Sequence, residues 1–174
     1  VFSNLINAGS YIFEDDVFDW MPHGRHSIER DVFPKLAEAN LLNGKEFEGY
    51  FIDAGTPTAW MEGVQRCIRE ERFNTGSAVD GTWYAKQSDY PSATIRGSMI
   101  EADVLIEQAS IVSSTLLAHT KVGLNAQISN SLVGRSATIG RDVILDGVVV
   151  DHDSSIPDGT VQEGGKWPKV DTAA

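Results

Sequence analysis

The sequence predicts an α/β segment followed by a left-handed parallel β-helix of hexapeptide repeats. Two observations carry this prediction: strand and helix signals alternate in the first half, and aliphatic residues recur six apart in the second half, with glycines between them. Such a period is typical of a β-helix in which each face contributes one inward side chain. We expect the α/β segment at 1–75, a linker at 76–94, the β-helix at 95–165 and a tail at 166–174.

The α/β segment is expected to begin with a strand and a helix. Apolar and aromatic residues favour a strand at 5–13, which ends at three acidic residues. Ser27 is a good N-cap for a helix from Ile28 to about Asn40, with acidic residues in its first turn. Pro34 lies late for a first-turn proline, so it predicts a kink or a later start of this helix.

A second strand and helix are expected next. Aromatic residues favour a strand at 46–53. Thr56 is a good N-cap, and Pro57 occupies the first helical position, which tolerates a missing N–H. Apolar residues then recur on one face to about Arg72, so we expect a helix that buries this face.

A series of aliphatic residues, which we expect to point inward, predicts the β-helix. Because three six-residue faces make a coil, residues 95–161 should form three to four coils. Breaks in the spacing near 117–121 and at Val133 predict a small loop or an irregular corner. An antiparallel all-β domain is the alternative, but hairpins rarely keep one spacing over several strands. The series comprises Ile100, Ile106, Val112, Val122, Ile128, Val133, Ile139, Leu145, Val150 and Ile156.

Composition excludes some classes of partner. The chain has 14 basic and 25 acidic residues and a net charge of -11, which disfavours nucleic acids and anionic membranes. The single cysteine, Cys67, cannot form an internal disulfide and indicates a reducing compartment. No apolar run has the length of a membrane span, and the first residues do not resemble a secretory signal, so we expect a cytoplasmic protein. The start at Val1, in a strand-like segment, is expected of a piece of a larger protein.

Asp53 is the strongest local candidate for chemistry. It follows the expected strand and precedes a glycine-containing turn into a helix, a place where open α/β sheets bind ligands. A carboxylate there suits Mg²⁺, which prefers one or two carboxylates together with substrate phosphate oxygens. Alternatively, Asp53 caps the turn or the following helix. Both interpretations stay open.

Three segments carry a family resemblance. Residues 6–13 read INAGSYIF, residues 27–36 read SIERDVFPKL, and residues 49–57 read GYFIDAGTP. Their order and spacing, with a hexapeptide array after them, resemble the C-terminal part of the Rossmann-like nucleotidyltransferase domain of sugar-phosphate pyrophosphorylases. Mannose-1-phosphate guanylyltransferase-like members are the most similar.

The resemblance implies a function and a set of site residues. The family joins a sugar 1-phosphate to a nucleoside triphosphate, releases pyrophosphate and uses Mg²⁺; guanosine and mannose are the favoured specificities. It implies that Asp53 is one of two catalytic, metal-holding aspartates and that Asn7 and Gly9 line the sugar-phosphate pocket. It also implies that Glu29 contacts sugar hydroxyls, although an acidic residue favourably placed at a helix start explains Glu29 equally well. The family's glycine-rich nucleotide loop and first metal aspartate would lie upstream of Val1, so we expect the chain alone to be inactive.

Two other functions remain open. Hexapeptide β-helices also host acyltransferases that use a histidine as general base, and His119 or His152 could take that role; each also fits an exposed turn. The second alternative is a non-catalytic oligomerisation or regulatory module whose flat faces make homo-oligomers. His23 and His26 flank a glycine-arginine loop, but two histidines without a third ligand are weak evidence for a metal site.

Overall fold

The computed structural model describes residues 5–49, 51–86 and 90–168. The chain divides into two compact units, residues 1–51 and residues 52–174, and each is described by itself. Within the described ranges, the structure contains no helix with the length and apolar character of a membrane span.

The described part of the first unit contains three short helical segments around a small core. They are the 3-10 helix η1 (Asp15–Trp20), the π-helix η2 (Ile28–Val32) and the α-helix α1 (Phe33–Glu38). The Ser27 hydroxyl accepts the Arg30 N–H at 3.3 Å, so the predicted N-cap is confirmed. Pro34 lies in the first turn of α1, and the predicted later start of the regular α-helix is also confirmed. The core residues are Val17, Val32 and Leu36.

The strands predicted at 5–13 and 46–53 are absent from the described residues of both segments, so these two predictions are wrong. A strand must exchange backbone hydrogen bonds with a neighbouring strand, and no described strand pairs with either segment. Their apolar side chains consequently stay in solvent: Ile12 is fully exposed and Phe47 is 75% exposed. The residue types favour a strand, but the pairing partner is missing from what the structure describes.

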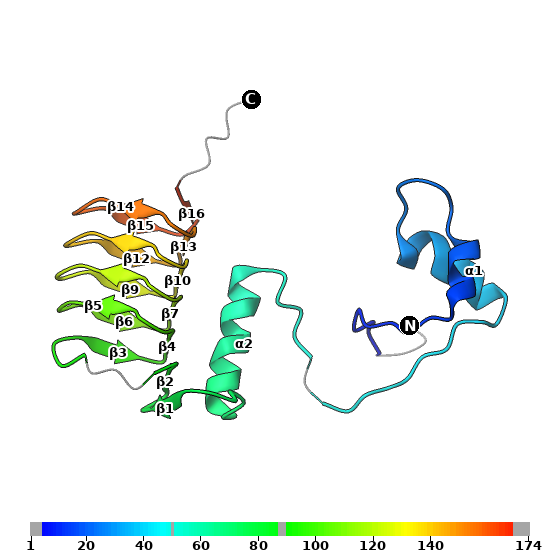
Figure 1. The fold of residues 1–174 in the computed structure, drawn as a ribbon, viewed down its shortest axis with the longest axis horizontal. Helices are drawn as coiled ribbons and strands as arrows, with labels where there is room; N and C mark the ends of the chain where they lie inside the picture. The colour runs from blue at the N-terminus through cyan, green and yellow to red at the C-terminus, as the bar shows by residue number, and fades with distance from the viewer. Residues whose placement is uncertain (1–4, 50, 87–89, 169–174) are drawn as a thin grey trace. The chain divides into compact units, whose positions relative to one another are not determined.

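The second unit begins with the helix α2 (Pro57–Arg69), which runs beside one face of the β-helix (Figure 1). The Thr56 hydroxyl accepts the Ala59 N–H at 3.2 Å, which confirms the predicted cap. The buried side chains of Val64 and Ile68 pack with Trp83 and Met99 of the β-helix. This apolar contact fixes α2 on the sheet.

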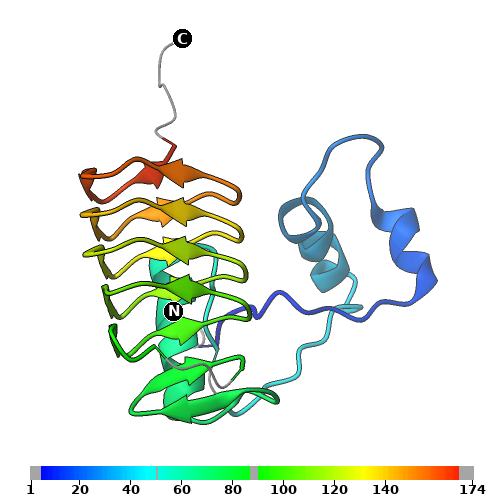
Figure 2. The same cartoon turned by 60° about the vertical axis from the view of Figure 1, so that its left-hand side comes forward.

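Three parallel sheets form the β-helix, and its coils lie one above another in Figures 1 and 2. The first sheet has the order β1 (Ser77–Val79), β2 (Thr82–Tyr84), β4 (Met99–Ile100), β7 (Thr115–Leu116), β10 (Leu132–Val133), β13 (Val149–Val150) and β16 (Lys166–Trp167). The second has the order β14 (Ser155–Ile156), β11 (Thr138–Ile139), β8 (Lys121–Val122) and β5 (Leu105–Ile106). The third has the order β15 (Val161–Glu163), β12 (Ile144–Asp146), β9 (Gln127–Ser129), β6 (Ser110–Val112) and β3 (Thr94–Arg96).

All described strand pairs are parallel except β1 with β2, so the predicted β-helix is confirmed and the antiparallel alternative is wrong. Strands β1 and β2 fall within the expected linker at 76–94, and β16 falls within the expected tail. Both β2 and β16 pair with strands of the first sheet. The domain boundaries drawn from the sequence stay a prediction.

The coils are shorter than the predicted eighteen residues. Leu116 lies opposite Val133, and Val133 lies opposite Val150, which makes a coil of 17 residues; Ile100 lies opposite Leu116, which makes a coil of 16. The corner from the third sheet to the first has only two residues between its strands, whereas the corners on either side of the second sheet have three or four. The first residue of this short corner is Gly97, Ser113, Asn130, Gly147 or Gly164 in successive coils, each with positive φ. The third sheet has five strands, so the expected three to four coils were too few.

The corner from β5 to β6, residues 107–109, is one residue shorter than its equivalents in the next two coils and corrects one predicted inward position. Ile111 is fully buried and lies opposite Ile128, whereas Val112, the predicted inward residue, is 37% exposed. The other members of the predicted series are buried or pack against the core. No extra loop occurs at 117–121, because this turn pairs with the equivalent turn of the next coil: Ser136 N–H donates to the Ala118 carbonyl at 2.9 Å. The break in spacing at Val133 arises from the two-residue corner between the third and first sheets, residues 130–131.

A ladder of buried serines joins successive coils at this corner. Ser98, Ser114 and Ser131 are all 0% exposed. The Ser114 N–H donates to Ser98 Oγ at 3.1 Å, and the Ser131 N–H donates to Ser114 Oγ at 3.1 Å. The Val148 N–H donates to Ser131 Oγ at 3.0 Å and ends the series. Each hydroxyl therefore satisfies a buried amide of the next coil, as buried polar groups require.

Candidate functional site

Asn7, Gly9 and Glu29 lie together in the first unit. Asn7 Oδ1 accepts the Gly9 N–H at 2.8 Å, and Asn7 Nδ2 donates to Glu29 Oε1 at 3.1 Å. Gly9 has a φ of +70°, and no atom lies within 4 Å of where a side chain would begin. The structure thus brings together the three residues that the resemblance assigned to substrate, in a place that a ligand can approach closely.

Tyr11 belongs to the same cluster, although no sequence pattern assigned it a role in a site. Its hydroxyl accepts from Asn7 Nδ2 at 2.6 Å and donates to Glu29 Oε1 at 2.5 Å. The hydrogen bond to the Glu29 carboxylate raises the pKa of Tyr11 above its ordinary value. The ring also packs edge-on against Phe33, with centroids 4.9 Å apart. A tyrosine in a predicted strand looks like a core residue, so only its place in the 6–13 motif signalled a polar role.

The chemistry of this cluster suits a hydroxyl-rich ligand. A carboxylate accepts hydrogen bonds, an amide both donates and accepts them, and a phenol does both. All of the described hydrogen bonds of the cluster are exposed to solvent. Glu29 is held beside them because it lies in the first turn of η2, directly after the Ser27 cap. The Asn7–Tyr11–Glu29 cluster, with Gly9 beside it, can therefore exchange its internal hydrogen bonds for bonds to sugar hydroxyls.

Asp53 lies in the second unit, in the turn before α2. Its Oδ1 accepts the Gly55 N–H at 3.1 Å, so the carboxylate caps this turn. Among the residues that the structure describes, no group of three histidine, cysteine, aspartate or glutamate side chains is arranged to hold a metal. His23 and His26 accordingly form no such site, and His26 Nδ1 instead lies 2.8 Å from the Gly24 carbonyl oxygen. A metal-holding role of Asp53 stays a prediction.

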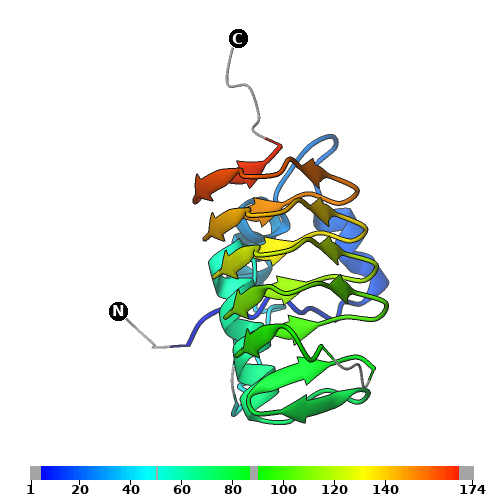
Figure 3. The same ribbon diagram turned by 90° about the vertical axis from the view of Figure 1, so that its left-hand side faces the viewer.

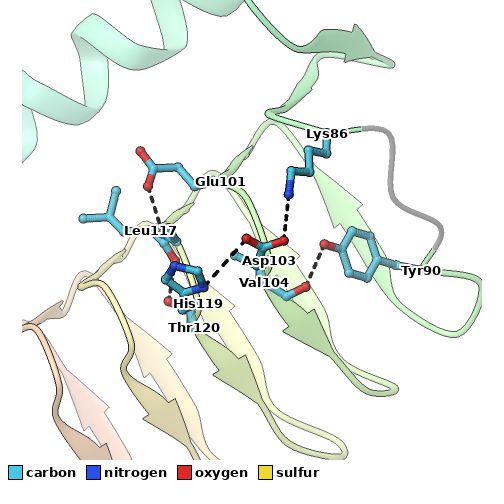
Figure 4. A network of polar contacts seen from close by, with 9 residues as sticks. Lys86, Tyr90, Glu101, Asp103, Val104, Leu117, His119 and Thr120 are labelled. Carbon is cyan, nitrogen blue, oxygen red and sulfur yellow. Dashed lines mark hydrogen bonds and ion pairs between the residues drawn. The ribbon is translucent and has the colours of Figure 1, made fainter.

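His119 belongs to a charged network at a corner of the β-helix (Figure 4). Lys86 Nζ lies 2.9 Å from Asp103 Oδ1, and His119 Nδ1 lies 3.8 Å from Asp103 Oδ2. The hydrogen bond from Lys86 lowers the pKa of Asp103. A separation of 3.8 Å is too long for a hydrogen bond that would orient an imidazole base. These contacts describe an exposed ion pair better than a catalytic dyad.

His152 lies two coils further along the same corner series. Its Nδ1 accepts the Arg135 N–H at 2.8 Å. The neutral ring therefore carries its hydrogen on Nε2, and the lone pair that a general base needs is already bound. His152 borders a hollow of about 280 Å³ on the first sheet, together with Trp60, Leu132 and Val149. Neither histidine thus shows the arrangement that the acyltransferase alternative requires.

Comparison with known proteins supports the resemblance found in the motifs. Residues 83–166 match the family described as GlmU-like, C-terminal hexapeptide. Mannose-1-phosphate guanylyltransferase 1 of Arabidopsis thaliana is 27% identical over 93% of this chain and 48% of its own length. Mannose-1-phosphate guanyltransferase of Candida albicans is 31% identical over 84% of this chain and 44% of its own length. The corresponding Mycobacterium tuberculosis protein is 32% identical over 92% of this chain and 38% of its own length.

The chain therefore spans about half the length of the curated relatives it matches. The similarity covers the nucleotidyltransferase motifs of the first half as well as the coils of the second. Together with the β-helix, it identifies the chain as a relative of the C-terminal portion of sugar-1-phosphate nucleotidyltransferases of the mannose-1-phosphate guanylyltransferase type, with a hexapeptide-repeat domain at residues 83–166.

Proposed function

We propose that this chain supplies the sugar-phosphate side of a nucleotidyltransferase and the β-helix that assembles it. The reaction transfers a nucleotidyl group from a nucleoside triphosphate, with GTP favoured, to a sugar 1-phosphate, with mannose 1-phosphate favoured, and it releases pyrophosphate. The names of the relatives support both specificities. The observation that carries the proposal is the contact of Asn7 with Gly9 and Glu29, which joins two motifs 22 residues apart around groups suited to a sugar.

The residues of this chain would act by binding and orientation. Glu29 and Asn7 would exchange their mutual hydrogen bond for bonds to sugar hydroxyls, and the open space at Gly9 would admit the sugar phosphate close to the backbone. Tyr11 would hold the Glu29 carboxylate in place, because its hydroxyl donates to the same oxygen. Fixing the sugar in this way would align the phosphate of the sugar 1-phosphate for attack on the nucleoside triphosphate. Such positioning lowers the entropic cost of bringing the two reactants together.

Asp53 fits Mg²⁺ as one ligand among several. Its carboxylate is a hard oxygen donor, and Mg²⁺ is commonly held by one or two carboxylates while waters and substrate phosphates fill its other positions. The turn that it caps leads into α2, so the carboxylate is fixed relative to a stable helix. When bound, the ion would neutralise charge on the phosphates.

Binding of mannose 1-phosphate to the chain tests the sugar site. We expect the ligand to shift the backbone NMR signals of Asn7, Gly9 and Glu29. Glu29→Gln should weaken binding about 10-fold or more, because a hydrogen bond to a charged group contributes roughly 1.5–3 kcal/mol. Asn7→Ala should weaken it by a few fold, because a neutral hydrogen bond contributes about 1 kcal/mol. Glu38→Gln removes the same charge from exposed α1 and should leave binding unchanged. Absence of shifts at millimolar mannose 1-phosphate would reject the site.

Pyrophosphate release tests whether the chain acts alone. The sequence contains no glycine-rich phosphate loop between a strand and a helix, so we expect no release from GTP and mannose 1-phosphate. Release that Asp53→Asn abolishes would reject this expectation while supporting the reaction.

The single cysteine, Cys67, supports a reducing compartment and hence a cytoplasmic enzyme.

A non-catalytic assembly role for the β-helix is the second candidate. It is favoured by apolar side chains that its strands leave in solvent, among them Ile144 and Val161. A stack of coils with such a surface is suited to binding another copy of itself, so we propose that the complete protein is a homo-oligomer through this domain.

A further inference from the structure

The outward side chains of β3, β6, β9, β12 and β15 form a flat surface, here called the third-sheet face. Figure 3 shows these strands stacked in register from coil to coil. Side chains alternate along a strand, so the residues on either side of the inward ones make two outward rows. The helix α2 packs against the first sheet, through Trp83 and Met99, and does not contribute to this face.

Three of the four large apolar side chains that the described parallel strands leave exposed lie on the third-sheet face, and the fourth, Leu105, lies on the second sheet. Val112 is 37% exposed, Ile144 is 40% exposed and Val161 is 71% exposed. Ile144 and Val161 are neighbours on adjacent strands, where they form one continuous apolar strip. A contiguous apolar strip such as Ile144 with Val161 is a feature of interaction sites, whereas single exposed apolar side chains are ordinary.

Charges on this face are segregated along the stack. One outward row runs from Arg96 through Val112 and Ser129 to Asp146 and Glu163. The row is therefore positive at its first coil and negative at its last two. Asp146 accepts hydrogen bonds from Ser129 and Asn130, both at 2.8 Å, which keep its carboxylate ionised. A surface with opposite charges at its two ends is complementary to itself when one copy is turned end over end.

Two symmetric pairings are possible, and the charges distinguish them. If two stacks ran in the same direction, the carboxylates of Asp146 and Glu163 from both copies would crowd at one end, and like charges repel. If the stacks ran in opposite directions, Arg96 of each copy would meet Glu163 of the other, and β9 would cross its own equivalent at the centre. We propose that the third-sheet face binds the same face of a second copy of this chain, with the two stacks antiparallel.

The size of the face sets the expected affinity. Five strands about 4.8 Å apart span roughly 20 Å along the stack, so even with the flanking corners the face is smaller than the ~800 Å² per partner of a standard interface. We therefore expect a weak dimer, with a dissociation constant in the micromolar range or above. The inference deepens the proposed assembly role and rests on it, but its measurement requires neither nucleotide nor sugar.

Sedimentation equilibrium of the full chain, from about 10 µM to 1 mM, tests the pairing. Arg96→Glu and Glu163→Arg should each weaken dimerisation at least 10-fold, because each places like charges opposite one another. The double variant Arg96→Glu with Glu163→Arg should restore it, since the exchange rebuilds both contacts. Arg141→Glu, an exposed charge change at another corner, serves as the matched control and should have no effect. Circular dichroism of each variant checks that the β-helix is folded.

Disulfide trapping in a Cys67→Ser background tests the direction. Gln127→Cys, on the central strand, should form covalent dimers under mild oxidation. Val161→Cys alone should not, but it should cross-link to Thr94→Cys when the two variants are mixed. A wild-type chain that is monomeric at 1 mM, a charge exchange without recovery, or self-linking of Val161→Cys would each overturn the proposal. These outcomes leave the sugar-binding measurement untouched, so failure of the pairing and failure of the proposed function are separable.

Discussion

Replacing Ser114 with alanine tests the serine ladder. The Ser114 hydroxyl receives the Ser131 N–H at 3.1 Å and donates to the Val112 carbonyl at 2.8 Å. In Ser114→Ala the Val112 carbonyl keeps a second donor, the Asn130 N–H at 3.1 Å. The Ser131 amide loses its described acceptor within a residue that is 0% exposed. The substitution therefore leaves one buried donor unsatisfied.

An unsatisfied buried amide costs about 1–3 kcal/mol. With a urea dependence of roughly 2 kcal/mol per molar, the unfolding midpoint should fall by about 1 M. Urea unfolding followed by circular dichroism measures this shift. Ser155→Ala, at an exposed position on the outer side of β14, removes the same hydroxyl and should change the midpoint by less than about 0.25 M. Equal midpoints for Ser114→Ala and Ser155→Ala would refute the role assigned to the ladder.

Three further predictions concern a corner, the candidate site and a surface charge. Gly134→Ala should lower the thermal unfolding temperature much more than Gly159→Ala. A side chain at 134 would lie 2.6 Å from the backbone of the next coil, whereas a side chain at 159 meets open space and only the strain of a φ of +68°. Equal losses of stability would contradict this prediction. Glu29→Gln should lower the pKa of Tyr11, because it removes the carboxylate that opposes phenolate formation; NMR titration of labelled tyrosine reads the change, and an unchanged pKa would exclude the contact. Because the pKa of Asp103 is lowered, its ion pair stabilises the fold at pH values above the ordinary carboxylate pKa, and this stabilisation is lost as the pH falls through the lowered pKa. The unfolding temperature of Asp103→Asn should therefore differ from that of the wild type at pH 7 and equal it at pH 2. A difference that does not change with pH would contradict this prediction.

The β-helix could be predicted from sequence because its inward positions are aliphatic and regularly spaced. The prediction failed at Val112 because Ile111 beside it is also aliphatic, and spacing alone cannot tell which of two such neighbours points inward. Only the three-residue corner from β5 to β6 decides, by placing Ile111 opposite Ile128. The coil count was too low for a different reason. At 17 residues per coil the expected range 95–161 still holds about four coils, but β2 and β16 extend the stack into the segments expected to be linker and tail.

The strands of the first half failed for another reason. Residue types at 5–13 and 46–53 favour an extended backbone, but a strand also needs a partner, which lies outside any local pattern. Asn7, Gly9 and Glu29 were named through the family resemblance, and the structure shows the contacts that join them. Tyr11 was missed because sequence patterns assign an aromatic side chain among apolar residues to a core.

The nearly constant coil length limits how the second unit can change in length. Nearly every contact in the stack joins residues 16 or 17 positions apart, so each coil depends on its immediate neighbours and on little else. Insertion or removal of one whole coil would keep every remaining residue in register, whereas a change of one or two residues would turn inward side chains outward in all later coils. The β-helix can therefore be lengthened or shortened only by whole coils, and its stability should rise with each added coil.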